Sequence, residues 1–457
     1  MPGDQRHYFA PWERAFLKVL TPFEEFIHRQ TTTGILLMLC AVVALIIANS
    51  PLLDAYEELL HVNMGVLIGS WQIKHSLHHW INDGLMAIFF FVVGMEIKRE
   101  VLVGELSNIK NATLPIIGAI GGMAIPALFY WFFNQQGAGA SGWGIPMATD
   151  IAFAVGVMAL LGSRVPRGLL TFLVALAIVD DLGAVTVIAL FYTDSINMAY
   201  LGGGVLITVL MVALNLIGVR NPLPYFLLAL FLWIAMEGSG IHATIAGVIG
   251  ALTIPAYARY SPKDFSDEIR GALDQFDKHE ITDASLINNP HQSSLAWKME
   301  RTFNLTISPL QRLESAFHIP STYIVIPLFA LANAAIPLDS ESIVEAVVDP
   351  VAIGIAVGLV LGKVVGVAGC VLLAWKLGLG QLPQQTTPSH IVGAGFLAGI
   401  GFTMSIFISE LAFAWDGEQV TLAKMGILFA SLVAGLVGYG WLRWVAPAPD
   451  EVMDSDH

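Results

Sequence analysis

Four charged residues lie inside long apolar stretches of the sequence. Asp150 lies in GIPMATDIAFAVG, Asp180 and Asp181 are adjacent in ALAIVDDLGAVTVI, and Lys363 lies in GLVLGKVVGV. A charged side chain at the centre of a membrane helix costs about 2.5–3.5 kcal/mol on insertion scales, so residues of this kind are rarely retained without a function. These four residues are therefore the first candidates for a functional site.

The adjacent aspartates predict a site for protons or for a hard cation. Neighbouring helix residues diverge by about 100°, so Asp180 and Asp181 do not both face one partner. One carboxylate can face a cation pathway while the other meets Lys363, the only Lys or Arg away from the ends of a predicted span. Carboxylate oxygens suit hard cations such as Na⁺ or Li⁺, and repulsion between two close carboxylates favours a proton on one of them. Competition between a proton and a cation is what an exchanger needs, whereas a purely structural ion-pair network is the alternative.

Polar residues near predicted span ends are weaker candidates. Asp83 lies in WINDGLMAIFF and His242 lies in SGIHATIAG. His75, His78 and His79 have the spacing of metal ligands on a helix, but we expect them at an external boundary with no carboxylate partner. We therefore interpret these three histidines as membrane-boundary residues.

The composition predicts an all-α integral membrane protein. Of 457 residues, 56% are hydrophobic and 13% are charged, against about 25% charged in soluble domains. The net charge of −14 argues against a nucleic acid partner. About 20 apolar residues cross a bilayer, and windows of this kind predict about twelve spans. These windows lie near 30–49, 80–100, 113–133, 145–162, 168–192, 199–219, 223–236, 241–257, 319–336, 350–374, 390–410 and 424–445.

The basic residues predict the topology. With twelve spans and a cytoplasmic N-terminus, nearly all of the 22 Lys and Arg residues fall on the cytoplasmic side, which is the positive-inside pattern. Residues 29–445 form the membrane domain, between a cytoplasmic N-terminal segment (1–28) and a cytoplasmic C-terminal tail (446–457). An external β-hairpin is expected at about 60–75, and a charged cytoplasmic insertion at about 258–318.

Two glycine-rich stretches interrupt the helical pattern. The first, GASGWGIPMATD, ends at Asp150, and the second is GAGFLAGIGFTMS at 393–405. Helix ends left inside a membrane expose about half a charge each. Asp150 is placed to offset exposed N-termini, and Lys363 is placed to offset exposed C-termini. The two halves of the chain would then contain an inverted pair of three-helix units.

Several motifs resemble the NhaA family of bacterial Na⁺/H⁺ antiporters over about residues 25–440. They are ATDIAFAVGVMALLGSRVP, LVALAIVDDLGAVTVIALFYT, WINDGLMAIFFFVVGMEIKRE, SGIHATIAGV, IPLFALANAAIPL and GFLAGIGFTMSIFIS. Antiporters of this family are themselves a known case of paired broken helices in an inverted-repeat fold. The resemblance implies twelve helices, of which the fourth and the eleventh are unwound and cross.

The resemblance also implies a function and a site. The expected activity is electrogenic export of Na⁺ or Li⁺ for a larger number of imported protons, without a cofactor, in the bacterial inner membrane. Asp180 and Asp181 would bind the cation and protons, Lys363 would pair with Asp180, and Thr149 and Asp150 would lie at the helix crossing. Either Lys363 or Asp180 would carry the second proton. The external hairpin would join two protomers into a homodimer.

The family's region of pH regulation corresponds to charged residues at the cytoplasmic side. By motif these are Glu96, Arg99 and Glu100 in MEIKRE and Glu314 in RLESAFH, with His318 nearby. Ordinary solvation and topology are the alternative interpretation of each charge. After Glu314 the chain departs from the family, because Ser315 takes a position often filled by His and the cytoplasmic insertion is long. Both differences concern the pH set-point and not transport itself.

Four other functions fit the sequence less well. An intramembrane aspartyl protease needs two facing carboxyls that share a proton, and a neighbouring Asp and a buried Lys would upset that state. A passive channel needs no proton site matched to a lysine. A transporter of organic substrates would need more aromatic and amide groups than the predicted pocket around the buried charged residues offers. No GxxxxGK[ST] motif is present to drive transport with ATP.

Overall fold

The computed structural model describes residues 30–68, 71–193, 196–278 and 289–447. The predicted N-terminal segment (1–28) and nearly all of the predicted tail (446–457) lie outside the described residues. Most of the described chain is helical, with a single small sheet in that part. Contacts divide the chain into two compact units, each built from separate stretches of sequence.

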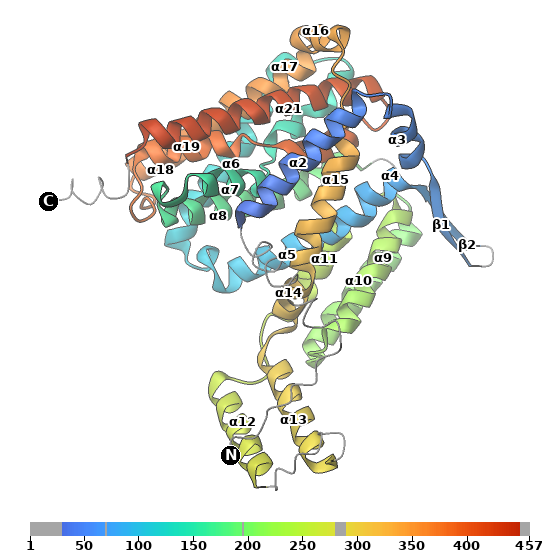
Figure 1. Cartoon of the computed structure of the whole chain (residues 1–457), viewed down its shortest axis with the longest axis vertical. Coiled ribbons are helices and arrows are strands. Elements are labelled where there is room, and N and C mark those ends of the chain that lie inside the picture. Colours follow the sequence, from blue (N-terminus) through green and yellow to red (C-terminus); the bar gives the residue numbers. More distant parts are fainter. Residues whose placement is uncertain (1–29, 69–70, 194–195, 279–288, 448–457) are drawn as a thin grey trace, which may run out of the picture. The chain divides into compact units, whose positions relative to one another are not determined.

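Of the described residues, the first unit contains 30–56, 113–180 and 330–447. Its main helices are α2 (Gln30–Ala48), α6 (Ile109–Phe133, whose first turn belongs to the second unit), α7 (Ile151–Leu160), the first half of α8 (Arg167–Phe191), α16 (Ser340–Val348), α17 (Pro350–Val357), α18 (Cys370–Lys376), α19 (Pro388–Ala398), α20 (Phe402–Ala412) and α21 (Gly417–Gly440). Short π-helical stretches, η7 (Gly358–Gly362) and η8 (Val364–Gly369), flank Lys363 between α17 and α18. Helices α19 and α21 lie side by side (Figure 1).

Small residues let helices of the first unit approach closely. A Cβ atom built on Gly34 of α2 would lie 2.9 Å from the Cα of Gly156 on α7. Glycine removes that clash, as is usual where membrane helices pack tightly. A core of buried apolar side chains, among them Leu173, Val371 and Ala394, then fills the space between α8, α18 and α19.

The second unit is made of the described residues within 57–112 and 181–329. Its elements include β1 (Asn63–Ile68), β2 (Trp71–Ser76), α4 (Leu77–His79), η1 (Trp80–Leu85), α5 (Met86–Val103), α9 (Met198–Ile217), α10 (Pro222–Ser239), α11 (Ile245–Thr253) and α14 (Pro309–Pro320), together with the second half of α8. The strands pair antiparallel, with Asn63 opposite Ser76 and Ile68 opposite Trp71. The predicted β-hairpin is therefore confirmed, although its tip at 69–70 lies outside the described residues.

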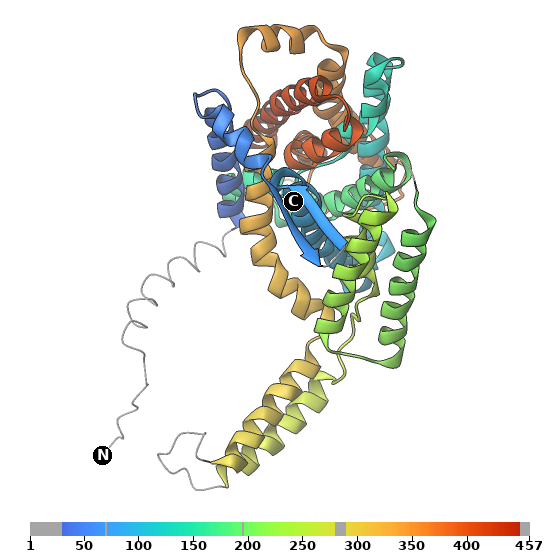
Figure 2. The same cartoon turned by 90° about the vertical axis from the view of Figure 1, so that its right-hand side faces the viewer.

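The charged insertion predicted at 258–318 contains a pair of helices. Helices α12 (Pro262–Asp277) and α13 (Pro290–Thr306) lie side by side (Figure 2). Ser261 and Asp264 form a capping box that starts α12 after a stretch without helix. Lys298 and Glu268 join the two helices at 2.8 Å on an exposed face. Residues 279–288 of the insertion lie outside the described residues.

The helices of both units are apolar enough for a multi-pass membrane protein. By length and composition, seven described helices can cross a membrane, or up to ten if each of three bent pairs is one span. A helix or a bent pair covers each of the twelve predicted windows. However, α11 has 9 residues, and at about 1.5 Å per residue it is too short to cross alone. The number twelve therefore stays a prediction.

Candidate functional site

Both glycine-rich stretches are interrupted helices in the structure. Residues 148–150 are not helical, and they separate η3 (Ala138–Met147) from α7 with a bend of 45°. The second interruption lies between α19 and α20 and also bends the chain by 45°. Each interruption leaves backbone groups without intrahelical partners in the first unit.

The two interruptions bond directly to each other, and Asp150 makes most of the contacts. Its backbone N–H donates to the carbonyl of Ile400 at 2.7 Å. Its Oδ1 accepts from the N–H of Phe153 at 3.1 Å, and its Oδ2 accepts from the N–H of Thr403 at 3.0 Å and from the Thr403 hydroxyl. One carboxylate thus caps the first turns of both α7 and α20, where negative charge is favourable.

Lys363, Asp180 and Thr149 form a closed polar cluster beside the interruptions. The Nζ of Lys363 lies 2.5 Å from Asp180 Oδ2 and 3.0 Å from Thr149 Oγ1. The Thr149 hydroxyl lies 2.8 Å from the same Asp180 oxygen and 2.9 Å from the carbonyl of Ala398. Its single proton serves one of these two acceptors at a time. The cluster therefore connects α8, the Lys363 segment and the end of α19.

This cluster is fully removed from the surface. The side chains of Lys363 and Asp180 are 0% exposed. Such a pair is stable only if attraction and hydrogen bonds offset the cost of removing both charges from water. One oxygen, Asp180 Oδ1, is buried and has no hydrogen-bond partner among the described residues. A buried carboxylate oxygen with spare acceptor capacity suits a proton, a water molecule or a hard cation. Asp181, the next residue along α8, is 1% exposed.

Comparison with known proteins shows the family of the chain. Residues 24–442 match the model of the family described as Na⁺/H⁺ antiporter 1. The chain belongs to this antiporter family. It is 52% identical to the protein named Na⁺/H⁺ antiporter NhaA of Sulfurimonas denitrificans, over 96% of this chain and 98% of the relative. It is also 52% identical to Na⁺/H⁺ antiporter NhaA 1 of Saccharophagus degradans, over 94% and 93% of the two chains.

A third relative, the NhaA antiporter of Dichelobacter nodosus, is 44% identical over 96% of this chain and 95% of its own. Membership in the antiporter family places the chain among secondary transporters that span a membrane several times, and not among enzymes.

The residues predicted for pH regulation come together in the second unit. Arg99 on α5 lies 3.3 Å from Glu314 on α14 and 3.4 Å from Glu100. His318, one turn after Glu314, lies 3.9 Å from Glu96. Two helices therefore bring three carboxylates, one guanidinium and one imidazole into a single charged cluster. Its Arg99 and His318 side chains are 42% and 58% exposed, so the cluster is open to solvent.

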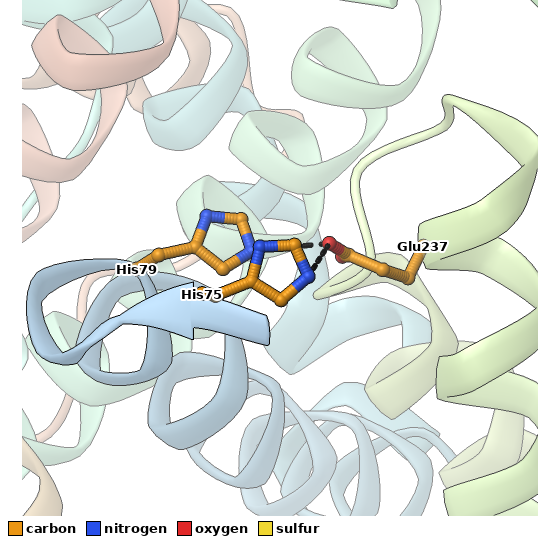
Figure 3. A group of neighbouring side chains, drawn as sticks. All are labelled: His75, His79 and Glu237. Carbon is orange, nitrogen blue, oxygen red and sulfur yellow. Dashed lines mark hydrogen bonds and ion pairs between the residues drawn. The ribbon is translucent and has the colours of Figure 1, made fainter. Parts of the chain in front are cut away.

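The expectation that the boundary histidines lack a carboxylate partner is wrong. Glu237 on α10 lies 3.0 Å from His79 and 3.7 Å from His75 (Figure 3). Asp83 lies 3.1 Å from the other ring nitrogen of His79. The hydrogen bond with Glu237 raises the pKa of His79, whereas burial and the neighbouring His79 lower the pKa of His75. His242 bonds instead to the carbonyl of Tyr192, at 2.6 Å.

Three contributing residues escaped sequence reasoning. Thr403 bonds Asp150, and the Ser405 hydroxyl donates to the carbonyl of Ile145 at 2.8 Å. Hydroxyls in a glycine-rich run carry no signal of their own. The sequence did contain a signal for Glu237, because it is the only charged residue in the apolar stretch PLPYFLLALFLWIAMEGS. The predicted window ended at residue 236, one position before it.

Proposed function

We propose that this chain is an electrogenic antiporter that exports Na⁺ or Li⁺ in exchange for a larger number of imported protons. The observation that carries the proposal is the buried Lys363–Asp180–Thr149 cluster, with Asp181 adjacent on α8 and two interrupted helices bonded beside it. Its relatives are named Na⁺/H⁺ antiporters, which supports the same cargo. The transported ions are substrates, and the proposal requires no cofactor.

The proposed mechanism is competition at one site that opens to each side in turn. At alkaline cytoplasmic pH the aspartates release protons, and Asp181, helped by Asp180, binds the cation through carboxylate oxygens. The segment that contains the interrupted helices then rearranges and exposes the site to the outside. Protonation there expels the cation. Interrupted helices suit this role because α7 and α20 are connected by the hydrogen bonds of the Asp150 carboxylate and not by a continuous backbone.

Two routes for the second proton follow from the cluster. In one route Asp180 takes a proton and releases Lys363 from the pair. In the other route Lys363 itself loses a proton when the cation binds. Replacing Lys363 by glutamine separates them, because a lysine carrier predicts exchange that becomes electroneutral. An Asp180 carrier predicts exchange that stays electrogenic. A voltage-sensitive dye in proteoliposomes reads this difference.

The same proposal includes the membrane arrangement. It comprises a twelve-span domain over 29–445 in the bacterial inner membrane, crossing fourth and eleventh helices, and cytoplasmic segments at 1–28 and 446–457. The hairpin at 60–75 would join two copies into a homodimer. In support, among the described residues the strands of the hairpin pair only with each other, which leaves sheet edges of the kind that pair with a second copy.

We also propose that the charged cluster on α5 and α14 regulates transport by pH. Glu96, Arg99, Glu100, Glu314 and His318 lie close enough for one proton to change the pairing of Arg99. Replacing Arg99 by glutamine should shift the pH of half-maximal exchange without removing exchange. A matched change in the solvent-exposed insertion, Arg270→Gln, should leave that pH unchanged.

The geometry argues against the protease. Asp180 pairs with Lys363, and Asp150 caps two helices, so neither carboxyl is placed to share a proton with the other.

The test of the antiporter is proton movement in everted membrane vesicles with an acid interior. Addition of Na⁺ or Li⁺, but not K⁺, should collapse the gradient, and Asp181→Asn should abolish the response. A response to K⁺ equal to that to Na⁺, or full activity of Asp181→Asn, would contradict the proposal. A channel would change the membrane potential without moving protons.

A further inference from the structure

A second group of ligand-type side chains lies in the other unit. His75 on β2, His79 on α4 and Glu237 on α10 each offer one ligand atom, and these atoms lie within 4.8 Å of one another. Figure 3 shows both imidazole rings turned toward the carboxylate of Glu237, which lies 158 residues after His79 in the sequence. The rings stack at 4.1 Å with 20° between their planes. The antiport mechanism uses none of these three residues.

The spacing fits a small tetrahedral metal ion. Ligand bonds of about 2.0–2.1 Å place the ligand atoms of a tetrahedral zinc site about 3.3 Å apart. The nitrogens of His79 and His75 lie 3.0 Å and 3.7 Å from the Glu237 oxygen, on either side of that value. Two imidazoles and one carboxylate are a known protein ligand set for zinc, with water in the fourth position. The distances from Glu237 to the two histidines therefore fit the ligand spacing of one ion.

Asp83 completes the arrangement behind His79. Its Oδ2 lies 3.1 Å from His79 Nδ1, while His79 Nε2 faces Glu237. A metal-binding imidazole usually donates its other N–H to a carboxylate, which fixes the tautomer and the direction of the ring. Asp83 would hold the proton on Nδ1 and leave the lone pair of Nε2 for the ion. A chance pair of histidines would not require this second carboxylate.

The backbone fixes where the ligands lie. His75 pairs with Met64 in the hairpin, and the Ser76 hydroxyl caps α4 by accepting from the N–H of His79 at 3.2 Å. Glu237 lies in the last turn of α10, which is followed by the cap residue Gly240 with a φ of 84°. A hollow of about 630 Å³, lined by Glu237 and residues 196–198 and 238–240, opens beside the carboxylate. The side chains of His75 and His79 are themselves 33% and 34% exposed, so an ion in solution can reach the ligands.

We propose that His75, His79 and Glu237 form a binding site for a divalent transition-metal ion, with Zn²⁺ as the preferred occupant and Asp83 as the residue that orients His79. The ion would tie the end of the hairpin to α10. The ligand set separates this site from the transport site: imidazole nitrogen favours Zn²⁺, Cu²⁺ and Ni²⁺, whereas the aspartates offer only oxygen, which favours Na⁺ and Li⁺. The proposal does not depend on the antiport function.

The test is Zn²⁺ binding by full-length protein in detergent, after removal of any histidine tag and of bound metal. Competition with a chromophoric chelator should give one site per chain. His75→Ala and Glu237→Gln should each weaken Zn²⁺ binding at least about 100-fold. Asp83→Asn should weaken it about 10-fold, because His79 then loses the carboxylate that orients its ring. His61→Ala is the matched control, because His61 lies before the same hairpin and bonds the carbonyl of Glu57. It should bind as the unchanged protein does.

A second measurement covers variants that fail to fold. Co²⁺ bound to the unchanged protein should give the intense visible absorption of a tetrahedral ion with nitrogen and oxygen ligands, and Zn²⁺ should remove it. Equal Zn²⁺ affinity in the unchanged protein and in the double variant His75→Ala/Glu237→Gln would overturn the proposal. So would a weak octahedral Co²⁺ spectrum, or no Zn²⁺ binding at about 100 μM, since that corresponds to less than about 5.5 kcal/mol.

Discussion

Two pairs of a basic side chain and a carboxylate in this molecule have similar lengths but different surroundings. Lys363 and Asp180 are 2.5 Å apart and 0% exposed, whereas His79 and Glu237 are 3.0 Å apart with side chains 34% and 22% exposed. In a buried pair, loss of one partner leaves a charge that water cannot reach, so each residue depends strongly on the other. In a half-exposed pair, water replaces much of the lost attraction.

The ligand atoms of the two regions differ as well. Around Asp180 the neighbouring atoms are carboxylate, hydroxyl and carbonyl oxygens with one ammonium group. Around Glu237 they are two imidazole rings with a second carboxylate behind one of them. The first set suits exchange of a proton for a hard cation that leaves easily. The second set suits slow binding of a transition metal. Burial and ligand type together would explain why the first cluster exchanges its ion, as proposed, and the second holds it.

The largest expected effect is on stability after removal of Lys363. Lys363→Met should lower the free energy of unfolding by about 3–5 kcal/mol, because it leaves Asp180 buried without its counter-charge. Adding Asp180→Asn to the same protein should recover at least half of that loss, since no charge then remains. Chemical unfolding in detergent, with both single variants and the double variant, measures the coupling. Additive losses in the double variant would show that the two side chains are not a pair.

The next largest effect is expected from the helix caps. Asp150→Ala removes the cap of α7 and the cap of α20, so it should cost about 2 kcal/mol or more, twice the usual value for one cap. Asp416→Ala is the matched control, because Asp416 caps only α21 through the N–H of Gln419 at 3.2 Å. Its expected cost is about 1 kcal/mol. Equal costs for the two variants would mean that Asp150 does not serve both helices.

A smaller and pH-dependent effect is expected from Glu237→Gln in the presence of a metal chelator. The hydrogen bond with Glu237 raises the pKa of His79 in the folded protein. Its stabilisation is therefore complete below the unfolded pKa of about 6.5 and is lost as the pH rises through the folded pKa. The variant should lose about 1 kcal/mol or less at pH 6 and almost nothing at pH 9. Thermal unfolding at both pH values measures this, and a loss that is larger at pH 9 would contradict it.

The smallest effect is expected on the exposed face of the insertion. Lys298→Ala breaks the pair with Glu268, whose side chains are 49% and 43% exposed. Such a pair contributes about 0.5 kcal/mol or less. We expect no measurable change in unfolding or in the rate of Na⁺-driven proton movement. A change in the rate would assign the insertion a role beyond that of a solvated spacer.

The sequence predicted the elements better than the contacts between them. Apolar windows and glycine-rich breaks predicted helices and interruptions, because these depend on local composition. The cost of a charge in a membrane also singled out Asp150, Asp180 and Lys363. By contrast, the Thr403 hydroxyl, which bonds Asp150 from 253 residues away, carries no local signal. The contact between Glu237 and the boundary histidines likewise joins segments far apart in the sequence, so local patterns did not predict it.

The number of spans shows a different limit. Hydropathy and the positions of basic residues predicted about twelve, whereas length and composition of the described helices give seven to ten. Short or polar helices such as α11 and α5 cause the difference. A helix of this kind can lie at membrane depth only when its neighbours cover it, and composition alone does not contain that information.

The central claim is that protons and Na⁺ compete for the aspartates on α8. It is tested most directly by calorimetric titration of the purified protein with Na⁺ at several pH values. For each proton that Na⁺ displaces, the apparent Kd for Na⁺ should rise about tenfold when the pH falls by one unit. The Asp181→Asn variant should not bind Na⁺. A Kd that does not change with pH, or Na⁺ binding that survives in Asp181→Asn, would contradict the account.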